Sequence, residues 1–304
     1  MKWIVKLVLA GAALAAIFTG CASFDEWQRR AIFQTDASGR YGSRPAPATV
    51  EEFDLPLADG EHVRAWYLAA TERHAATMLF LHGARRDLNG NGPRLERLQA
   101  LGFNVLAIDY RGFGASSARV PSEASALDDA RAALAELRRR EPDPARRFVY
   151  GYSLGGALAI ALAAEADGLA GVIVESSFTS IADVVRQSRW GWVPGLALLV
   201  TQQFNSLDRA PQINEPLLLI HGTADGLIPH TMSDQLFAAA AGVPDEHKRL
   251  LKIDGGRHWG AIWADSELFG RSVREFAAMA SRLGAVRTSG VGVMTAKTAG
   301  AAVR

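Results

Sequence analysis

The chain has 304 residues, of which 49% are hydrophobic and 21% are charged, as in a globular protein large enough to bury one core. A net charge of +1 excludes the strongly basic character of most nucleic-acid-binding proteins. The single cysteine excludes an internal disulfide. No regular spacing of Cys and His suggests a metal site, so we expect neither a metal nor another cofactor.

Residues 1–20 have the pattern of a signal peptide: a basic start and an apolar stretch, Leu7 to Phe18, that is short for a membrane span. The following Gly20-Cys21 resembles the cleavage site of bacterial lipoproteins. That resemblance implies that Cys21 carries a diacylglycerol and holds the protein on a membrane of the bacterial envelope, facing the periplasm. Ala22 favours the outer membrane by analogy with lipoprotein sorting. The alternatives are an ordinary secretory signal with an incidental cysteine and, less favoured, an uncleaved anchor.

Residues 21–47 mix charge, glycine and proline without clear periodicity, and we interpret them as a spacer with at most one short helix. The main domain is expected to span residues 48–283. It begins with two short strand-like runs between Val50 and Ala69, and Asp59-Gly60 between them predicts a hairpin turn.

Further apolar runs alternate with segments of helical periodicity, which predicts a mostly parallel central sheet with helices on both faces, an α/β fold. The runs are short and continuous, as expected of strands buried on both faces. They are Thr77–Leu81, Asn104–Ile108, Arg147–Tyr150, Gly171–Val174, Leu217–Ile220 and Leu250–Ile253. Helices are expected over Arg94–Leu101, from a cap at Ser122 to Arg140, and after Ser153.

Two segments depart from this alternation. Residues 181–214 are rich in large apolar side chains and predict a small helical cap, although an ordinary crossover helix on the sheet is the alternative. Residues 284–304 are small, with scattered Lys and Arg and no apolar face, so we expect them to be disordered.

The segment after the third of these runs carries the pattern of a nucleophile elbow, Gly151-x-Ser153-x-Gly155, between a strand and a helix. The glycines lack the Cβ atoms that would collide where a strained turn lifts the serine out of the sheet. Gly-x-Ser-x-Gly alone occurs by chance in many loops, but the strand-turn-helix context indicates that Ser153 is a nucleophile.

Cleavage by a serine requires a base that accepts its proton and an acid that orients the base, in the chain order Ser, acid, His. Asp225 and His258 satisfy this order, and each follows a buried strand, where ligand sites in open α/β sheets lie. Glu175, also at a strand end, is the competing acid.

The developing oxyanion needs N–H donors, and these are expected from the backbone of Leu154 and of Ala84, with Arg85 as the alternative to Ala84. His82 and His221 precede glycines at strand ends and are interpreted as structural. Asp109 is expected to anchor its own loop rather than to act on substrate.

Together these motifs resemble the α/β-hydrolase superfamily, and most of all its branch of serine-aminopeptidase-like and lysophospholipase-like enzymes. The resemblance spans about Val50 to Leu283. The motifs that carry it are Leu81-His82-Gly83, Asp109-Tyr110-Arg111-Gly112-Phe113-Gly114, Gly151-Tyr152-Ser153-Leu154-Gly155, Glu175-Ser176-Ser177-Phe178-Thr179-Ser180 and His221-Gly222-x-x-Asp225.

The leading hypothesis is a serine hydrolase of small-molecule carboxylic esters or thioesters, with no nucleic-acid partner. The alternatives are an amidase or aminopeptidase of the same fold and a non-catalytic binding lipoprotein. If Trp190 to Phe204 covers Ser153, its apolar groups should line the acyl pocket. Arg85 and Arg86 could favour an anionic head group, or be solvated surface residues.

Overall fold

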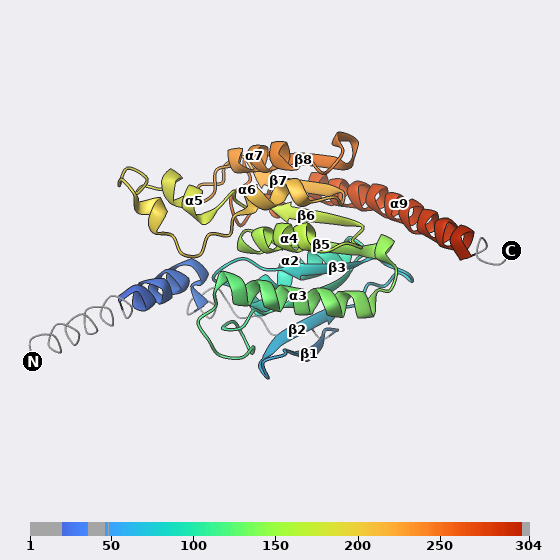
Figure 1. Ribbon diagram of the computed structural model, residues 1–304, viewed down its shortest axis with the longest axis horizontal. Coiled ribbons are helices and arrows are strands. Elements are labelled where there is room, and N and C mark those ends of the chain that lie inside the picture. Colours follow the sequence, from blue (N-terminus) through green and yellow to red (C-terminus); the bar gives the residue numbers. More distant parts are fainter. Residues whose placement is uncertain (1–19, 36–45, 48, 300–304) are drawn as a thin grey trace, which may run out of the picture.

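The computed structural model describes residues 20–35, 46–47 and 49–299. The predicted signal peptide therefore lies almost entirely outside the described residues. The described strands form one eight-stranded sheet in the order β1-β2-β4-β3-β5-β6-β7-β8 (Figure 1). They are β1 (Glu51–Pro56), β2 (His62–Leu68), β3 (Thr77–Leu81), β4 (Asn104–Ile108), β5 (Arg147–Tyr152), β6 (Gly171–Glu175), β7 (Leu217–Gly222) and β8 (Lys248–Ile253).

The pairing confirms the mostly parallel sheet. β1 and β2 form an antiparallel hairpin whose turn contains Gly60 at φ +85°, and β2 pairs antiparallel with β4. All later pairs are parallel, so the carboxyl ends of β3, β5, β6, β7 and β8 meet at one edge of the sheet.

Helices cover both faces of the sheet (Figure 1). They are α2 (Leu88–Ala100), α3 (Glu123–Arg140), α4 (Leu154–Glu165), α5 (Ile181–Gln187), α6 (Ser206–Arg209), α7 (Thr231–Ala239), α8 (Ala261–Ala264) and α9 (Ser266–Ala299). Leu79 and Leu81 of β3 belong to a core with α3, α4 and α7, whereas Met78 and Phe80 face a second core with α2 and α9. This alternation along one strand explains why the strands read as continuous apolar runs.

The starts of α3 and α2 show how capping side chains determine where a helix begins. α3 begins as predicted, because Ser122 and Ser125 form a reciprocal capping box. α2 begins earlier than predicted, at Leu88 rather than Arg94. The Asp87 side chain accepts the Gly90 N–H at 2.9 Å and caps this start, so the Asn-Gly-Asn-Gly-Pro stretch that resembles a loop is helical.

The spacer prediction is corrected by the helix over residues 20–33, which packs on the domain. Phe33 is fully buried, with ring centroids 5.9 Å from Phe204 and 6.5 Å from Phe113. Gln28 Nε2 donates to the carbonyl oxygen of Leu199 at 2.8 Å. Residues 20–35 therefore belong to the folded domain, and the rest of the predicted spacer lies mostly outside the described residues.

The two unusual segments are both helical in part. Residues 181–214 contain α5, α6 and the 3₁₀ turns Leu196–Leu199 and Ala210–Gln212.

α9 continues past Leu283 to Ala299, which corrects the prediction of disorder for 284–299; residues 300–304 lie outside the described part. Gly284 lies so close to Ala145 that a Cβ would meet its Cα at 2.9 Å, and Arg287 donates to the Leu169 carbonyl at 3.3 Å. Among the helices described here, none is long and apolar enough to cross a bilayer.

Candidate active site

Ser153 occupies the sharp turn between β5 and α4, with φ +53° and ψ −117°, a conformation that non-glycine residues rarely adopt. The turn needs its glycines. A Cβ on Gly151 would lie 2.2 Å from the Gly155 carbonyl oxygen, and one on Gly155 would lie 2.0 Å from that of Leu81. The Ser153 N–H donates to the Glu175 carbonyl oxygen at 2.8 Å, which ties the turn to β6. The predicted elbow is present.

The parallel sheet brings Ser153, His258 and Asp225 together from the ends of three strands. His258 Nε2 lies 3.0 Å from Ser153 Oγ, and His258 Nδ1 lies 2.7 Å from Asp225 Oδ2. Tyr152 Oη donates to the His258 carbonyl oxygen at 2.8 Å and so holds the loop after β8 against β5. This geometry is that of a hydrogen-bonded nucleophile, base and acid.

The carboxylate of Asp225 is buried but well satisfied. Its Oδ1 accepts the N–H groups of Leu227 and Ile228, each at 2.9 Å, and its Oδ2 also lies 3.2 Å from His221 Nε2. Burial alone would raise its pKa, but hydrogen bonds with His221 and His258 outweigh it and hold the pKa of Asp225 well below the usual value. Asp225 is therefore a carboxylate across the ordinary pH range.

The competing acid, Glu175, serves a different set of partners. Its carboxylate receives hydrogen bonds from Arg94 and from the hydroxyl of Tyr150, and all three side chains are buried. The Arg94 guanidinium also lies 4.2 Å from the centre of the Tyr152 ring. This cluster packs against Tyr152, the residue before Ser153. The sequence places Arg94 at the start of a predicted helix, but its pairing with Glu175, 81 positions away, was not predicted because no local pattern encodes it.

The two expected oxyanion donors both border the pocket in front of Ser153. Ala84 and Leu154 line it, and α4 begins with Leu154, so that the amides of its first turn are available to a substrate. The alternative donor, Arg85, is already used: its N–H donates to the Phe33 carbonyl oxygen at 3.0 Å. This contact favours Ala84 and fixes the loop after β3 to the N-terminal helix.

The remaining predicted polar residues have structural contacts. His82 is buried between Gly83 and Asp109, and His221 Nδ1 lies 2.6 Å from Ser233 Oγ. Asp109 Oδ1 accepts the Leu88 N–H at 2.9 Å and thereby positions the start of α2. Neither histidine is hydrogen-bonded to Ser153, although His221 bonds to Asp225, and their interpretation as structural residues stays a prediction.

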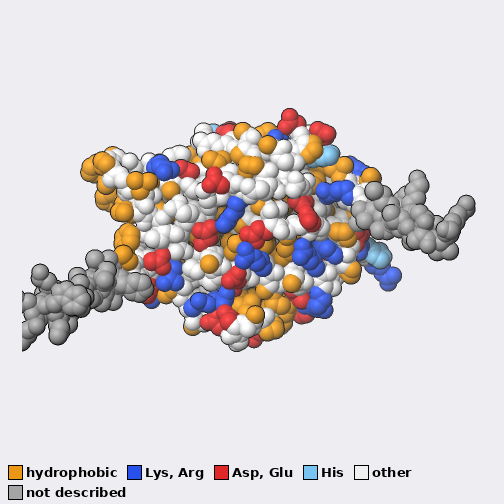
Figure 2. Space-filling view, in the orientation of Figure 1, with side chains coloured by type: hydrophobic (Ala, Val, Ile, Leu, Met, Phe, Trp, Pro, Cys, Tyr) orange, Lys and Arg blue, Asp and Glu red, His pale blue; other side chains and the backbone are white. Residues whose placement is uncertain are grey.

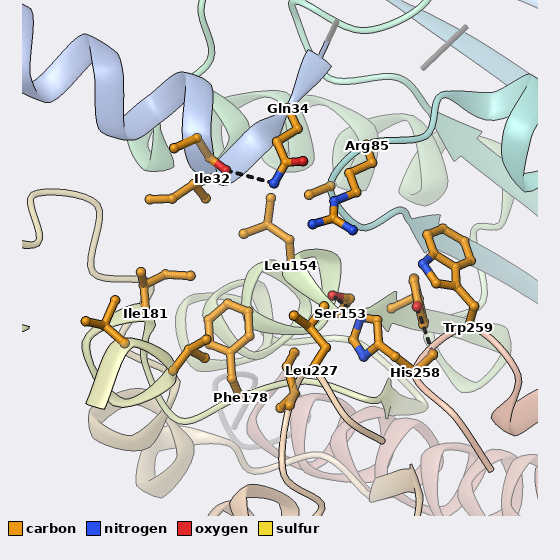
Figure 3. A pocket seen from close by; sticks show the side chains of 16 residues that line it. Ile32, Gln34, Arg85, Ser153, Leu154, Phe178, Ile181, Leu227, His258 and Trp259 are labelled. Carbon is orange, nitrogen blue, oxygen red and sulfur yellow. Dashed lines mark hydrogen bonds between the residues drawn. The ribbon is translucent and has the colours of Figure 1, made fainter. Parts of the chain in front are cut away.

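A cavity of about 250 Å³ opens at Ser153, and its walls are mostly apolar (Figure 3). The N-terminal helix and the residue after it contribute Ala31, Ile32 and Gln34, which sequence reasoning missed although Ala-Ile-Phe is a short apolar run. The other walls come from Arg85, Tyr152, Phe178, Ile181, Val184, Val185, Leu227, Ile228 and Trp259. Among these described lining residues there is no Asp or Glu.

The predicted cap contributes to this pocket differently from expectation. α5 lines it through Ile181, Val184 and Val185, whereas Trp190 and Leu199 lie outside it. Phe204 is fully buried in the core beside Phe33. The expectation that Trp190 to Phe204 lines the pocket at Ser153 is therefore wrong: η3 (Leu196–Leu199) lies against the N-terminal helix, where Gln28 donates to the Leu199 carbonyl oxygen.

Comparison with known proteins agrees with this architecture. The serine aminopeptidase family S33 matches residues 72–204. YfhR of Escherichia coli O157:H7, an uncharacterized protein, is 33% identical over 226 residues, which cover 72% of this chain and 76% of YfhR. The α/β hydrolase domain-containing protein WAV2 of Arabidopsis thaliana is 28% identical, over 89% of this chain and 91% of WAV2.

A solved structure shares the fold. The esterase Pf2001 of Pyrococcus furiosus superposes with a TM-score of 0.63 at 20% identity, and the match covers 76% of this chain and 91% of the esterase.

Proposed function

This chain belongs to the α/β-hydrolase superfamily, and we propose that it cleaves carboxylic esters or thioesters through an acyl-enzyme on Ser153. The observation that carries the proposal is the hydrogen-bonded series Ser153–His258–Asp225 at the mouth of an apolar pocket.

In the first half of the reaction, Ser153 Oγ attacks the substrate carbonyl carbon while His258 Nε2 accepts the hydroxyl proton. Asp225 holds the proton-bearing Nδ1 and stabilises the imidazolium that forms. The N–H groups of Ala84 and Leu154 would donate to the oxyanion, and one such donor typically contributes about 2.7–4 kcal/mol of transition-state stabilisation. The alcohol or thiol then leaves with the proton from His258.

In the second half, water replaces the leaving group. His258 accepts a proton from the water as it attacks the acyl carbon, and Ser153 recovers its proton when the free acid departs. The same two side chains therefore serve both halves, with water as the second reactant.

The pocket lining favours an acyl ester over a peptide with a free amino terminus. Such a peptide would need a carboxylate to bind its ammonium group, and the described residues around this cavity supply none. Arg85, which points into the pocket beside Gln34 (Figure 3), would disfavour an ammonium and accept an anionic head group. An amidase acting on neutral amides is the second candidate, because the same triad would cleave them.

A fluorophosphonate probe tests the nucleophile directly. The wild-type chain should be labelled, and Ser153→Ala should lose both labelling and turnover with its unfolding transition preserved, because the change removes one hydroxyl at the pocket. A panel of ester, thioester and aminoacyl-amide substrates then ranks the reactions. No labelling of the wild type would support a binding protein, and labelling retained in Ser153→Ala would place the nucleophile elsewhere.

We also propose that Cys21 carries the lipid anchor, on the basis of the Gly20-Cys21 pattern and its exposed position in the helix over residues 20–33. One acyl chain binds a membrane only marginally, and a diacylglyceryl group supplies the second chain that stable attachment needs. Metabolic labelling with a fatty-acid analogue should be lost in Cys21→Ser. Label retained in that variant would refute lipidation at this residue.

A further inference from the structure

A second apolar cavity, of about 340 Å³, lies between the N-terminal helix and the cap segment. Phe24 and Trp27 of the helix face Trp190, Leu196 and Leu199 of the cap across it. Its described lining residues include no charged side chain. The polar ones are Ser188 and Gln28, and Gln28 is occupied by hydrogen bonds to the backbone of Leu199 and Thr201. The cavity is thus suited to an uncharged hydrocarbon chain.

This cavity adjoins the pocket at Ser153. Ala31, Ile32, Ile181 and Val185 line both, so one row of apolar side chains separates the two spaces. Ile32 and Ile181 lie on the side of the pocket opposite His258 and Trp259 (Figure 3). An acyl chain that leaves Ser153 away from the imidazole therefore runs toward the second cavity.

The outer rim of this cavity is an exposed apolar surface. Trp27, Trp192 and Leu198 keep 63%, 76% and 80% of their surface exposed, and hydrophobic side chains gather over this end of the molecule in Figure 2. Exposed apolar patches of this kind mark binding surfaces, and tryptophan is enriched where proteins meet the membrane interface.

The position of Cys21 indicates that a membrane surface lies opposite this rim. Cys21 lies in the first turn of the helix over residues 20–33, and ten residues of helix place it only about 15 Å from Ala31 in the wall of the pocket. A membrane attached at Cys21 is therefore within reach of the rim.

We propose that this rim contacts the bilayer and that the second cavity receives the acyl chain of a membrane lipid whose ester group lies at Ser153. The inference rests on the proposed esterase function and specifies its substrate as a long-chain lipid ester. The N-terminal helix is then one wall of the acyl-binding site, in addition to connecting the domain to its anchor.

The first test fills the boundary between the cavities. Ala31→Phe in the full chain should slow labelling by a dodecyl fluorophosphonate far more than labelling by an ethyl fluorophosphonate, because only the long chain has to pass Ala31 into the second cavity. Each excluded methylene should cost about fourfold, so a loss of three or four methylenes corresponds to roughly a hundredfold. Ala264→Phe, at an exposed helical alanine outside both cavities, is the matched control. Equal effects of Ala31→Phe on the long and the short probe would overturn the acyl site, as would no effect on either.

The second test addresses the bilayer. Trp192 lines neither cavity, so Trp192→Glu should slow hydrolysis of an ester lipid presented in phosphatidylcholine vesicles and leave hydrolysis of a short soluble ester unchanged. Trp263→Glu, at another exposed tryptophan, should change neither. An unchanged vesicle rate for Trp192→Glu would overturn membrane contact. The same conclusion would follow if that variant changed only its oligomeric state. Failure of every probe to label the wild type would instead refute the esterase function.

Discussion

Replacement of Asp225 by Asn gives the sharpest test of the acid. The Asp225 carboxylate accepts the Leu227 and Ile228 N–H groups through Oδ1 and faces His258 Nδ1 through Oδ2 at 2.7 Å. An asparagine that keeps its oxygen toward the two backbone donors must turn its NH₂ group toward His258. That group donates, so the imidazole would present an acceptor at Nδ1 and carry its proton on Nε2, facing Ser153.

A proton on Nε2 removes the acceptor that Ser153 needs. The corresponding change in serine proteases lowers kcat by about 10⁴-fold, or about 5 kcal/mol of transition-state stabilisation. Glu175→Gln is the control, because Glu175 contacts Arg94 and Tyr150 rather than His258. We expect it to retain activity within about tenfold, and to lose about 3–5 kcal/mol of stability because Arg94 would be left as a buried unpaired charge.

Steady-state hydrolysis of p-nitrophenyl esters measures the activity of both variants, and urea unfolding measures their stability. Both assays are needed, because a destabilised variant that is partly unfolded would mimic a catalytic loss. Equal losses of kcat in two folded variants, or a larger loss in Glu175→Gln, would refute the assignment of Asp225 as the acid.

Three further predictions concern stability. Because the folded-state pKa of Asp225 lies below its usual value of 3.8, its ionised form stabilises the fold above that pH, and this contribution is lost as the pH falls toward the folded-state pKa. The difference in unfolding free energy between wild type and Asp225→Asn should therefore shrink from about pH 5 to about pH 3, and a constant difference in urea titrations would contradict this. Gly155→Ala places a Cβ 2.0 Å from a β3 carbonyl oxygen and should cost at least about 3 kcal/mol or prevent folding, whereas Gly226→Ala, with no atom within 4 Å, should be neutral in the same unfolding assay. Phe33→Ala should cost about 3–5 kcal/mol and lower activity together, since Phe33 is fully buried and its carbonyl oxygen accepts the N–H of Arg85, whereas Phe24→Ala should unfold like the wild type; equal midpoints for the two variants would mean that the helix does not pack on the domain.

The sequence alone determined the sheet and the strand ends at which Ser153, Asp225 and His258 lie. Continuous apolar runs such as Thr77–Leu81 identify strands buried on both faces, because both neighbouring layers exclude water from them. The elbow around Ser153 is visible because only glycine fits at its close approaches. Asp225 and His258 follow from topology, since the carboxyl ends of parallel strands share one edge and residues there meet whatever their separation in the chain.

Only the tertiary structure decided which surfaces surround Ser153. The helix over residues 20–33 shows no strong periodic pattern in the sequence. It is stabilised instead by contacts with Phe204 and Leu199, more than 160 residues away. The pairing of Arg94 with Glu175 joins residues 81 positions apart, and no local pattern encodes it. Hydrophobicity marks Trp190 and Leu199 as contact-forming, but it is non-directional, so only the packed fold determines that they line the second cavity instead of the pocket at Ser153.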